Sequence, residues 1–219
     1  MKRILPSLTL ILLLLVLGLS ACGPAPADVV SASSGDVRPN FQDDFSNPSS
    51  GWDRYQDDQM ITDYNNGSYR LRVDQSNKDI WSNPGQDFTD VQIDVDATRI
   101  GGPDKNDFGV ICRYQDENNF YSLLITSDQY FAILKEKDGR EVKLGSAEWK
   151  QSSAIQPGNA ANHIQAKCLG DRLSLVVNGT LLLAVQDSDF LRGDVGLVAG
   201  TYETPGTDIL FDHFIAVQP

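Results

Sequence analysis

DFGVICRYQDENNFYSLLI, residues 107–125, is the stretch that decides the fold of this chain. Two apolar runs of strand length flank the polar connector QDENN, which is the pattern of a β-hairpin. Both runs are apolar along most of their length, so we expect the hairpin to lie at the centre of a sheet.

The same pattern recurs on both sides of this hairpin. Apolar and polar residues alternate in short segments, and Asn-Gly or Asp-Gly pairs at 66–67, 138–139 and 178–179 mark tight turns. We expect strands at residues 68–73, 90–97, 130–135, 141–144, 162–168, 173–177, 181–185, 195–199 and 209–217, and a loop at 79–85. No amphipathic run is long enough for a core helix. The sequence therefore predicts an all-β domain, a two-sheet antiparallel jelly-roll sandwich.

Charge narrows the classes of partner. The chain has 219 residues, with 18 Lys and Arg against 30 Asp and Glu, and a formal net charge of −12. This length suffices for one all-β domain with a sizeable core. The negative charge disfavours nucleic acid and anionic membrane surfaces as partners, so cationic or neutral ligands fit better.

The N-terminus has the features of an export signal. Lys2 and Arg3 precede an almost wholly apolar run at 8–19, and the segment LSAC ends at Cys22. This segment resembles the leader and lipobox of bacterial lipoproteins, which implies cleavage before Cys22 and lipidation of that residue. The apolar run is shorter than the roughly 20 residues needed to span a bilayer, which argues against a transmembrane anchor.

Three segments follow from this reading. Residues 1–21 are expected to be a signal peptide, and 22–40 a lipidated cysteine with a disordered linker rich in Gly, Pro, Ala and Ser. Residues 41–219 form the expected jelly-roll domain. The protein would lie on the outer, extracytoplasmic face of a bacterial membrane, held only through the lipid on Cys22.

Two further cysteines remain, Cys112 and Cys168. In an oxidising compartment an even pair suggests a disulfide, and the alternative is two separately buried thiols. Alternation allows both side chains to point into one core. We favour the bridge.

Several short motifs, in a specific order, carry a family resemblance. They are DF at 44–45, SGW at 50–52, GVICRY at 109–114, NFY at 119–121, VNG at 177–179, GDVGL at 193–197 and FDHF at 211–214. The order resembles that of the concanavalin A-like lectin and glucanase superfamily, and is similar to the laminin-G-like and family 16 glucanase-like domains of bacterial surface lipoproteins. The resemblance implies a curved jelly roll whose concave face binds glycans in many relatives.

Catalysis is not expected from the carboxylates. Family 16 glucanases carry Glu-x-Asp-x-x-Glu on one strand, and no glutamate of this chain fits that spacing. Asp94 and Asp96 share one strand face and are the nearest substitute, although a solvated outer face is the better interpretation. His163 and His213 are interpreted as surface or packing residues.

Calcium is the one ion that the resemblance suggests, as a structural ion where the terminal strands meet. Asp43, Asp44 and Asp212 are the candidate ligands, because the first and last strands should be neighbours. The alternative is that these residues cap turns. No other cofactor is expected.

A glycan site needs aromatic faces with polar groups at their edges. Trp81 and Trp149 lie in polar contexts that suggest loops, and Tyr121 and Tyr130 are further candidates for ligand binding. Trp52 and Tyr114 are interpreted as core residues. Arg113 should face away from Cys112 on its strand, where it would line a groove on the concave face.

These observations lead to one functional expectation with two alternatives. We expect a lipid-anchored, extracytoplasmic module that recognises carbohydrate on its concave face without catalysis. The first alternative is a protein-interaction or structural module of the cell surface. The second is a glycoside hydrolase that uses Asp carboxylates.

Overall fold

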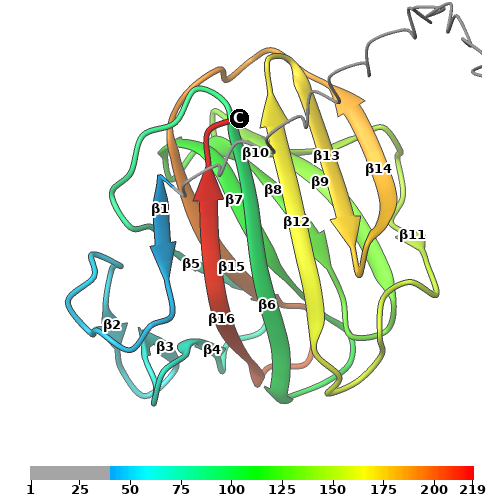
Figure 1. Ribbon diagram of the computed structural model, residues 1–219. Helices are drawn as coiled ribbons and strands as arrows, with labels where there is room; N and C mark the ends of the chain where they lie inside the picture. The colour runs from blue at the N-terminus through cyan, green and yellow to red at the C-terminus, as the bar shows by residue number, and fades with distance from the viewer. Residues whose placement is uncertain (1–39) are drawn as a thin grey trace, which may run out of the picture. The chain divides into compact units, whose positions relative to one another are not determined.

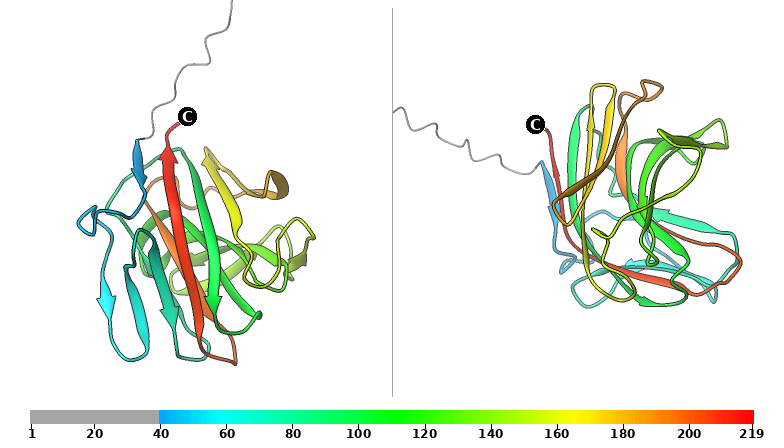
Figure 2. Two further views of the ribbon diagram at one scale, coloured as in Figure 1. Left: turned by 60° about the horizontal axis from the view of Figure 1, so that its bottom comes forward. Right: turned by 90° about the vertical axis from the view of Figure 1, so that its right-hand side faces the viewer.

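Two antiparallel β-sheets, stacked face to face, make up the domain. The structure is a computed structural model that describes residues 40–219, in which every regular element is a β-strand. In Figure 1 sheet A lies toward the viewer and sheet B behind it, and the right-hand view of Figure 2 shows the two layers from the side. The predicted all-β, two-sheet sandwich is confirmed. The interpretations of residues 1–39, including lipidation of Cys22, fall outside the described residues.

Sheet A has nine strands. Their order is β14 (Thr180–Gln186), β13 (Arg172–Val177), β12 (Asn162–Leu169), β6 (Val91–Gly101), β16 (Thr207–Val217), β4 (Tyr69–Val73), β3 (Met60–Tyr64) and β2 (Tyr55–Gln56), and β1 (Phe41–Asp43) also pairs with β16. The first strand therefore lies beside the last, as expected. No helix in residues 40–219 is long and apolar enough to cross a membrane.

Sheet B has seven strands. Their order is β10 (Arg140–Leu144), β9 (Tyr130–Lys137), β8 (Asn119–Ile125), β7 (Asn106–Asp116), β15 (Asp194–Thr201) and β5 (Asp79–Ser82), and β11 (Lys150–Gln151) also pairs with β9. The hairpin at 107–125 becomes β7 and β8, which are both interior strands. The expected central hairpin is confirmed.

Turn chemistry explains several of the tight connections. Asp138 and Gly139 have φ angles of 51° and 70°, and Asn178 and Gly179 have φ angles of 49° and 79°. Two consecutive residues with positive φ give a turn whose twist matches that of the strands, and Asx-Gly pairs tolerate that backbone. Where 79–85 was expected to be a loop, residues 79–82 instead form edge strand β5, because they pair with β15.

The core lies between the sheets, and one covalent bond crosses it. Cys112 of β7 and Cys168 of β12 form a disulfide, and both are fully buried. Strand β7 belongs to sheet B and β12 to sheet A, so the bond joins the two layers. The favoured interpretation of this cysteine pair is confirmed.

Removal of this bond should lower stability substantially. The chain-entropy model gives about 4 kcal/mol for a loop closed across 56 residues. We expect the double variant Cys112→Ala with Cys168→Ala to have a free energy of unfolding about 4 kcal/mol lower than the wild type in urea denaturation. A double variant as stable as the wild type would contradict a stabilising cross-sheet bond.

Candidate functional site

Sheet B has an apolar outer face as well as an apolar inner face. Strands β7, β8 and β9 are nearly continuous apolar runs, so alternation places half of their apolar side chains on the side turned away from the core. These side chains form a second cluster, made of Ile111, Phe120, Leu124, Ala132, Leu134 and Val198, with Trp81, Tyr114 and Trp149 packed against it. The six cluster residues are themselves buried, and the three aromatic side chains packed against them, Trp81, Tyr114 and Trp149, are half-buried.

A hollow of about 310 Å³ lies over this cluster, and we call it the sheet B groove. Its walls come from five strands of sheet B and two connecting segments. The lining residues are Asn77, Lys78, Asp79, Trp81, Glu117, Phe120, Ser122, Leu124, Leu134, Glu136, Glu141 and Val198. The groove therefore combines an apolar floor with four carboxylates and one lysine.

Aromatic rings form part of the floor. The ring centroid of Phe120 lies 5.6 Å from that of Trp81 and 5.7 Å from that of Tyr114, in tilted arrangements. Trp81 is half-buried, so part of its ring stays accessible to a ligand. The three rings hold one another in place, which reduces the loss of side-chain entropy on binding.

A second hollow of about 290 Å³ is the aromatic pocket, lined by Lys105, Thr126, Asp128, Tyr130, Trp149 and Tyr202. The Lys105 ammonium lies 5.3 Å from the ring centroid of Tyr202, a cation–π contact. Trp149 also packs against the apolar cluster beneath the groove. The two hollows therefore share one face of sheet B.

Two carboxylates meet over strand β15. Gly200 pairs with Asp79 of β5 and with Asp107 of β7. A Cβ atom at Gly200 would collide with Oδ1 of both aspartates, so the two oxygens occupy the space that a side chain would fill. Asp107 is 5% exposed and its Oδ1 has no hydrogen-bond partner.

Both carboxyl groups hold protons more tightly than usual. Burial, followed by the negative charges of Glu141 and Glu136, raises the pKa of Asp79 to about 6. Burial and the neighbouring charge of Asp79 raise the pKa of Asp107 well above its ordinary value, and contact with the Tyr202 hydroxyl partly offsets this. Burial also raises the pKa of Glu136. The groove thus concentrates negative charge that the fold does not neutralise.

Three of the five predicted ligand-binding residues lie on this face. Trp81 lines the groove, and Tyr130 and Trp149 line the aromatic pocket. Tyr121 does not, because it is fully buried in the core, where its hydroxyl accepts a hydrogen bond from the amide of Phe190 at 3.1 Å. Its selection as a ligand-binding residue was wrong, since residues 121, 123 and 125 face inward.

Arg113 is also misplaced by simple alternation. The pairing of β7 with its neighbours β8 and β15 shifts register next to Arg113, and Arg113 adopts a φ of 55°. The side chain is 1% exposed, and its Nη1 donates to the Phe190 carbonyl at 2.9 Å. A β-bulge inserts one residue and redirects the side chains after it, so Arg113 is buried and Tyr114 packs on the outer cluster instead of in the core. Arg113 does not line the groove.

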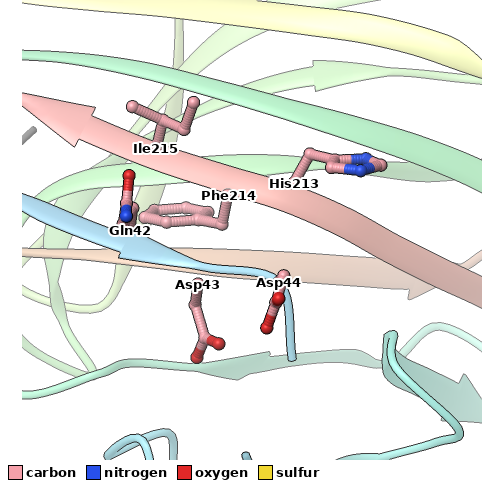
Figure 3. A pocket seen from close by; sticks show the side chains of 6 residues that line it. All are labelled: Gln42, Asp43, Asp44, His213, Phe214 and Ile215. Carbon is pink, nitrogen blue, oxygen red and sulfur yellow. The ribbon is translucent and has the colours of Figure 1, made fainter. Parts of the chain in front are cut away.

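The predicted calcium ligands Asp43, Asp44 and Asp212 lie on or next to the paired strands β1 and β16. The Asp43 carboxylate accepts hydrogen bonds from the Phe45 amide at 2.8 Å, from Trp52 Nε1 at 2.9 Å and from the Ser50 hydroxyl. These hydrogen bonds leave fewer free lone pairs on the carboxylate for a cation. Figure 3 shows the hollow beside this strand end, where the carboxylates of Asp43 and Asp44 extend away from the His213 ring.

Asp44 and Asp212 make local contacts. The Asp44 carboxylate accepts hydrogen bonds from the amide and hydroxyl of Ser46, at 3.0 and 2.6 Å, and these bonds lower its pKa. The Asp212 carboxylate accepts from the amide of His213 at 2.7 Å. In residues 40–219 no group of three or more Asp, Glu, His or Cys side chains is placed to hold a metal. Asp43 and Asp44 instead stabilise the turns after β1.

Asp94 and Asp96 lie on the outer face of sheet A. Asp94 accepts from Gln165 Nε2 at 2.7 Å, and a ring nitrogen of His163 lies 2.8 Å from Asp96 Oδ1. His213 Nδ1 lies 3.3 Å from the other oxygen of Asp96. Neither aspartate lines the sheet B groove, so a hydrolytic site built on this pair would lie on the opposite sheet.

The sequence did not predict the four acidic residues that line the groove, which we call the acidic rim, and it did not predict Tyr202. Asp79, Glu117, Glu136 and Glu141 come from four separate segments, and their convergence depends on the order of the strands in sheet B. One signal was available for Asp107. Alternation places Asp107 on the same strand face as Gly109 and Ile111, opposite to Cys112. An acidic residue on an otherwise apolar strand face is unusual.

Comparison with known proteins identifies the fold. No protein family and no curated protein matches the sequence. Solved structures do match. The carbohydrate binding module CBM66 from Bacillus subtilis has a TM-score of 0.60 at 16% identity, over 77% of this chain and 96% of that chain. A Bacillus subtilis protein of unknown function with a galectin-like fold has a TM-score of 0.61 at 10% identity, over 82% and 96%.

An enzyme shares the same architecture. The Bacillus licheniformis beta-glucanase has a TM-score of 0.57 at 9% identity, over 82% of this chain and 97% of that chain. At such identities the likeness shows the fold alone. The expected two-sheet jelly-roll fold is confirmed, and the solved structures that share it include a carbohydrate binding module and a beta-glucanase.

The Asp79 and Asp107 pair should make stability depend on pH. A carboxyl with a raised pKa in the folded state binds more protons than in the unfolded chain, so its stabilising contribution is present at about pH 4 and is lost as the pH rises through about 6. We expect Asp107→Asn to raise the free energy of unfolding at neutral pH by about 1 to 3 kcal/mol. The gain should shrink at about pH 4.

Urea denaturation at both pH values measures this effect. The matched control is Asp138→Asn, an exposed aspartate in the β9–β10 turn that loses the same charge. Equal effects of the two substitutions, or a gain for Asp107→Asn that does not depend on pH, would contradict a strained carboxylate pair.

Proposed function

We propose that the domain binds carbohydrate in the sheet B groove, without catalysis. The observation that carries this proposal is the half-buried Trp81 on an aromatic floor with polar groups at its rim. A sugar ring has apolar C–H faces and a girdle of hydroxyls. Such a ligand needs an aromatic surface and surrounding hydrogen-bond partners, and the groove supplies both.

The aromatic pocket extends this surface. Tyr130 is 36% exposed, and Trp149 and Tyr202 lie in the same pocket. Trp149 connects the pocket to the cluster beneath the groove. Two aromatic hollows on one face suit a ligand longer than one sugar, so we propose an oligosaccharide or polysaccharide.

The arrangement of carboxylates favours binding over hydrolysis. Glycoside hydrolysis uses two carboxyl groups that flank the scissile bond. Asp79 and Asp107 lie side by side against Gly200, and Asp107 is buried behind the groove. The other candidate pair, Asp94 and Asp96, lies on the opposite sheet. This geometry supports a non-catalytic site.

The proposed location rests on the sequence. The basic start, the apolar run at 8–19 and the LSAC segment support lipidation of Cys22 and an extracytoplasmic position. A carbohydrate-binding domain on a lipid anchor would hold the cell surface against a glycan. The disulfide between Cys112 and Cys168 is compatible with that oxidising compartment.

Binding to polysaccharides tests the function. We expect the full chain to bind at least one polysaccharide in affinity electrophoresis, and Trp81→Ala or Trp149→Ala to weaken that binding about tenfold, or about 1.4 kcal/mol, through loss of the stacking surface. Leu181→Ala is the control, because Leu181 is 57% exposed on β14 of sheet A. No retention by any polysaccharide would favour the protein-interaction alternative, and product release abolished by Asp94→Asn would restore the hydrolase.

Lipidation is tested separately. In a bacterial host we expect the wild-type chain to incorporate labelled fatty acid. Cys22→Ala should abolish this label, because Cys22 is the only residue expected to be acylated. Cys112→Ala with Cys168→Ala is the control for nonspecific labelling of cysteine. Fatty acid label that survives Cys22→Ala would exclude the proposed anchor.

A further inference from the structure

We propose that the glycan bound in the sheet B groove carries free, protonated amino groups. This inference rests on the proposed function, and it specifies the ligand class for the same site. It is carried by the sign and placement of the charges in the groove, by one buried oxygen without a partner, and by the aromatic floor.

Negative charge at the groove is mostly left without an ionic partner. The groove is lined by Asp79, Glu117, Glu136 and Glu141, and Lys78 is its one basic lining residue. Of the ion pairs found in residues 40–219, the only one to include these four acids joins Glu141 to Lys143 at 3.9 Å. That distance is near the limit for an ion pair in solvent, so it neutralises little.

Other acids on the molecule are paired closely. Asp208 lies 2.6 Å from Arg70, Asp87 lies 2.6 Å from Arg192, and Lys135 lies between Asp187 and Asp189 at 2.5 and 2.6 Å. The fold thus places basic side chains beside acids in many positions. The groove is where acids converge around an apolar floor and one lysine.

Asp107 supplies an independent observation. Its Oδ1 is buried without a hydrogen-bond donor and meets Asp79 over Gly200. A buried acceptor without a donor destabilises the folded state, and a second carboxylate beside it adds repulsion. Asp79 connects this strained oxygen to the groove, because Asp79 itself lines the hollow. A cation bound at Asp79 would relieve the repulsion within the pair.

An ammonium group on a sugar has the charge and the hydrogen-bond donors that match the carboxylates of the groove. It carries a positive charge and three hydrogen-bond donors, and the acids of the groove offer acceptors. The sugar ring would lie on Trp81 and Phe120 while its amino group contacts the rim. N-acetylation removes the charge, and a uronic acid would add repulsion from all four carboxylates. A metal ion fits less well, since residues 40–219 contain no group of three ligating side chains placed to hold one.

Binding of an amino sugar should be linked to protons. The groups that face Asp79 are Asp107, Glu136, Glu141 and Lys78, with Tyr202 beside Asp107. A bound ammonium favours the ionised carboxylate, so binding should release a proton from the pair, and affinity should fall when the pair is protonated. A neutral sugar has no such dependence.

Isothermal titration calorimetry of the full chain tests the inference with three probes of equal length. They are a β-1,4-linked glucosamine hexamer, its fully N-acetylated counterpart and a β-1,4-linked glucose hexamer. We expect the glucosamine hexamer to bind at least tenfold more tightly than either neutral hexamer at about pH 6.5. The advantage should fall about tenfold at about pH 4.5, where the amine stays charged and the carboxyl pair is protonated.

Two variants test whether the carboxylates of the groove cause the preference for the glucosamine hexamer. Asp79→Asn should lower the ratio of glucosamine-hexamer affinity to neutral-hexamer affinity by about tenfold, and an unchanged ratio would contradict the inference. Glu141→Gln, on edge strand β10, should reduce the preference in the same direction. Asp94→Asn is the matched control, because it removes one carboxylate from the outer face of sheet A.

The outcomes separate the two proposals. Equal binding of all three hexamers would overturn the amino-sugar inference and leave carbohydrate binding intact. No binding of any hexamer, together with no retention in the polysaccharide panel, would overturn both. A lysine-rich peptide that displaces labelled glucosamine hexamer at a lower concentration than unlabelled glucosamine hexamer does would also overturn it, in favour of a basic peptide ligand.

Discussion

The burial of apolar side chains on both faces of sheet B is the constraint on which the rest of this structure depends. Strands β7 and β8 face the core with Val110, Leu123 and their neighbours, and face outward with Ile111 and Leu124. An antiparallel sheet with one solvated face would carry polar residues on the outer side. Here the outer side carries a second, buried apolar cluster, and the sheet B groove lies over it.

The acidic rim follows from the position of that surface in the sheet. Apolar residues fill the middle of the outer face, and carboxylates come from its margins, with Asp79 on an edge strand and Glu117 in the β7–β8 turn. Desolvation raises the pKa of Asp79 and Asp107, which lowers stability at neutral pH. Strain of this kind is common at functional sites, where a ligand can relieve it.

Strand β7 also carries the cross-sheet disulfide and the bulge that follows it. Cys112 points into the core and bonds to Cys168 of the other sheet. The next residue, Arg113, takes a left-handed backbone and is buried with it, and Tyr114 then returns to the outer cluster. The bulge therefore adds an aromatic ring to the cluster beneath the groove. Two consecutive inward side chains cannot occur in a regular strand, which is why alternation misplaced both Arg113 and Tyr114.

The sequence by itself determined most of the longer strands, the tight turns, the cysteine pair and the two-sheet class, because alternation and Asx-Gly turns are local signals. It did not determine β3 or β5. It also indicated Trp81, Tyr130 and Trp149 by residue type. Only the tertiary structure decided which residues share the groove, since the order of the strands, the bulge at Arg113 and the meeting of Asp79 with Asp107 over Gly200 depend on strands far apart in the chain. The surroundings of Asp43, a predicted calcium ligand, were likewise decided by the tertiary structure. The hydrogen bonds that occupy Asp43 come from Ser50 and Trp52, and that contact exists only in the folded domain.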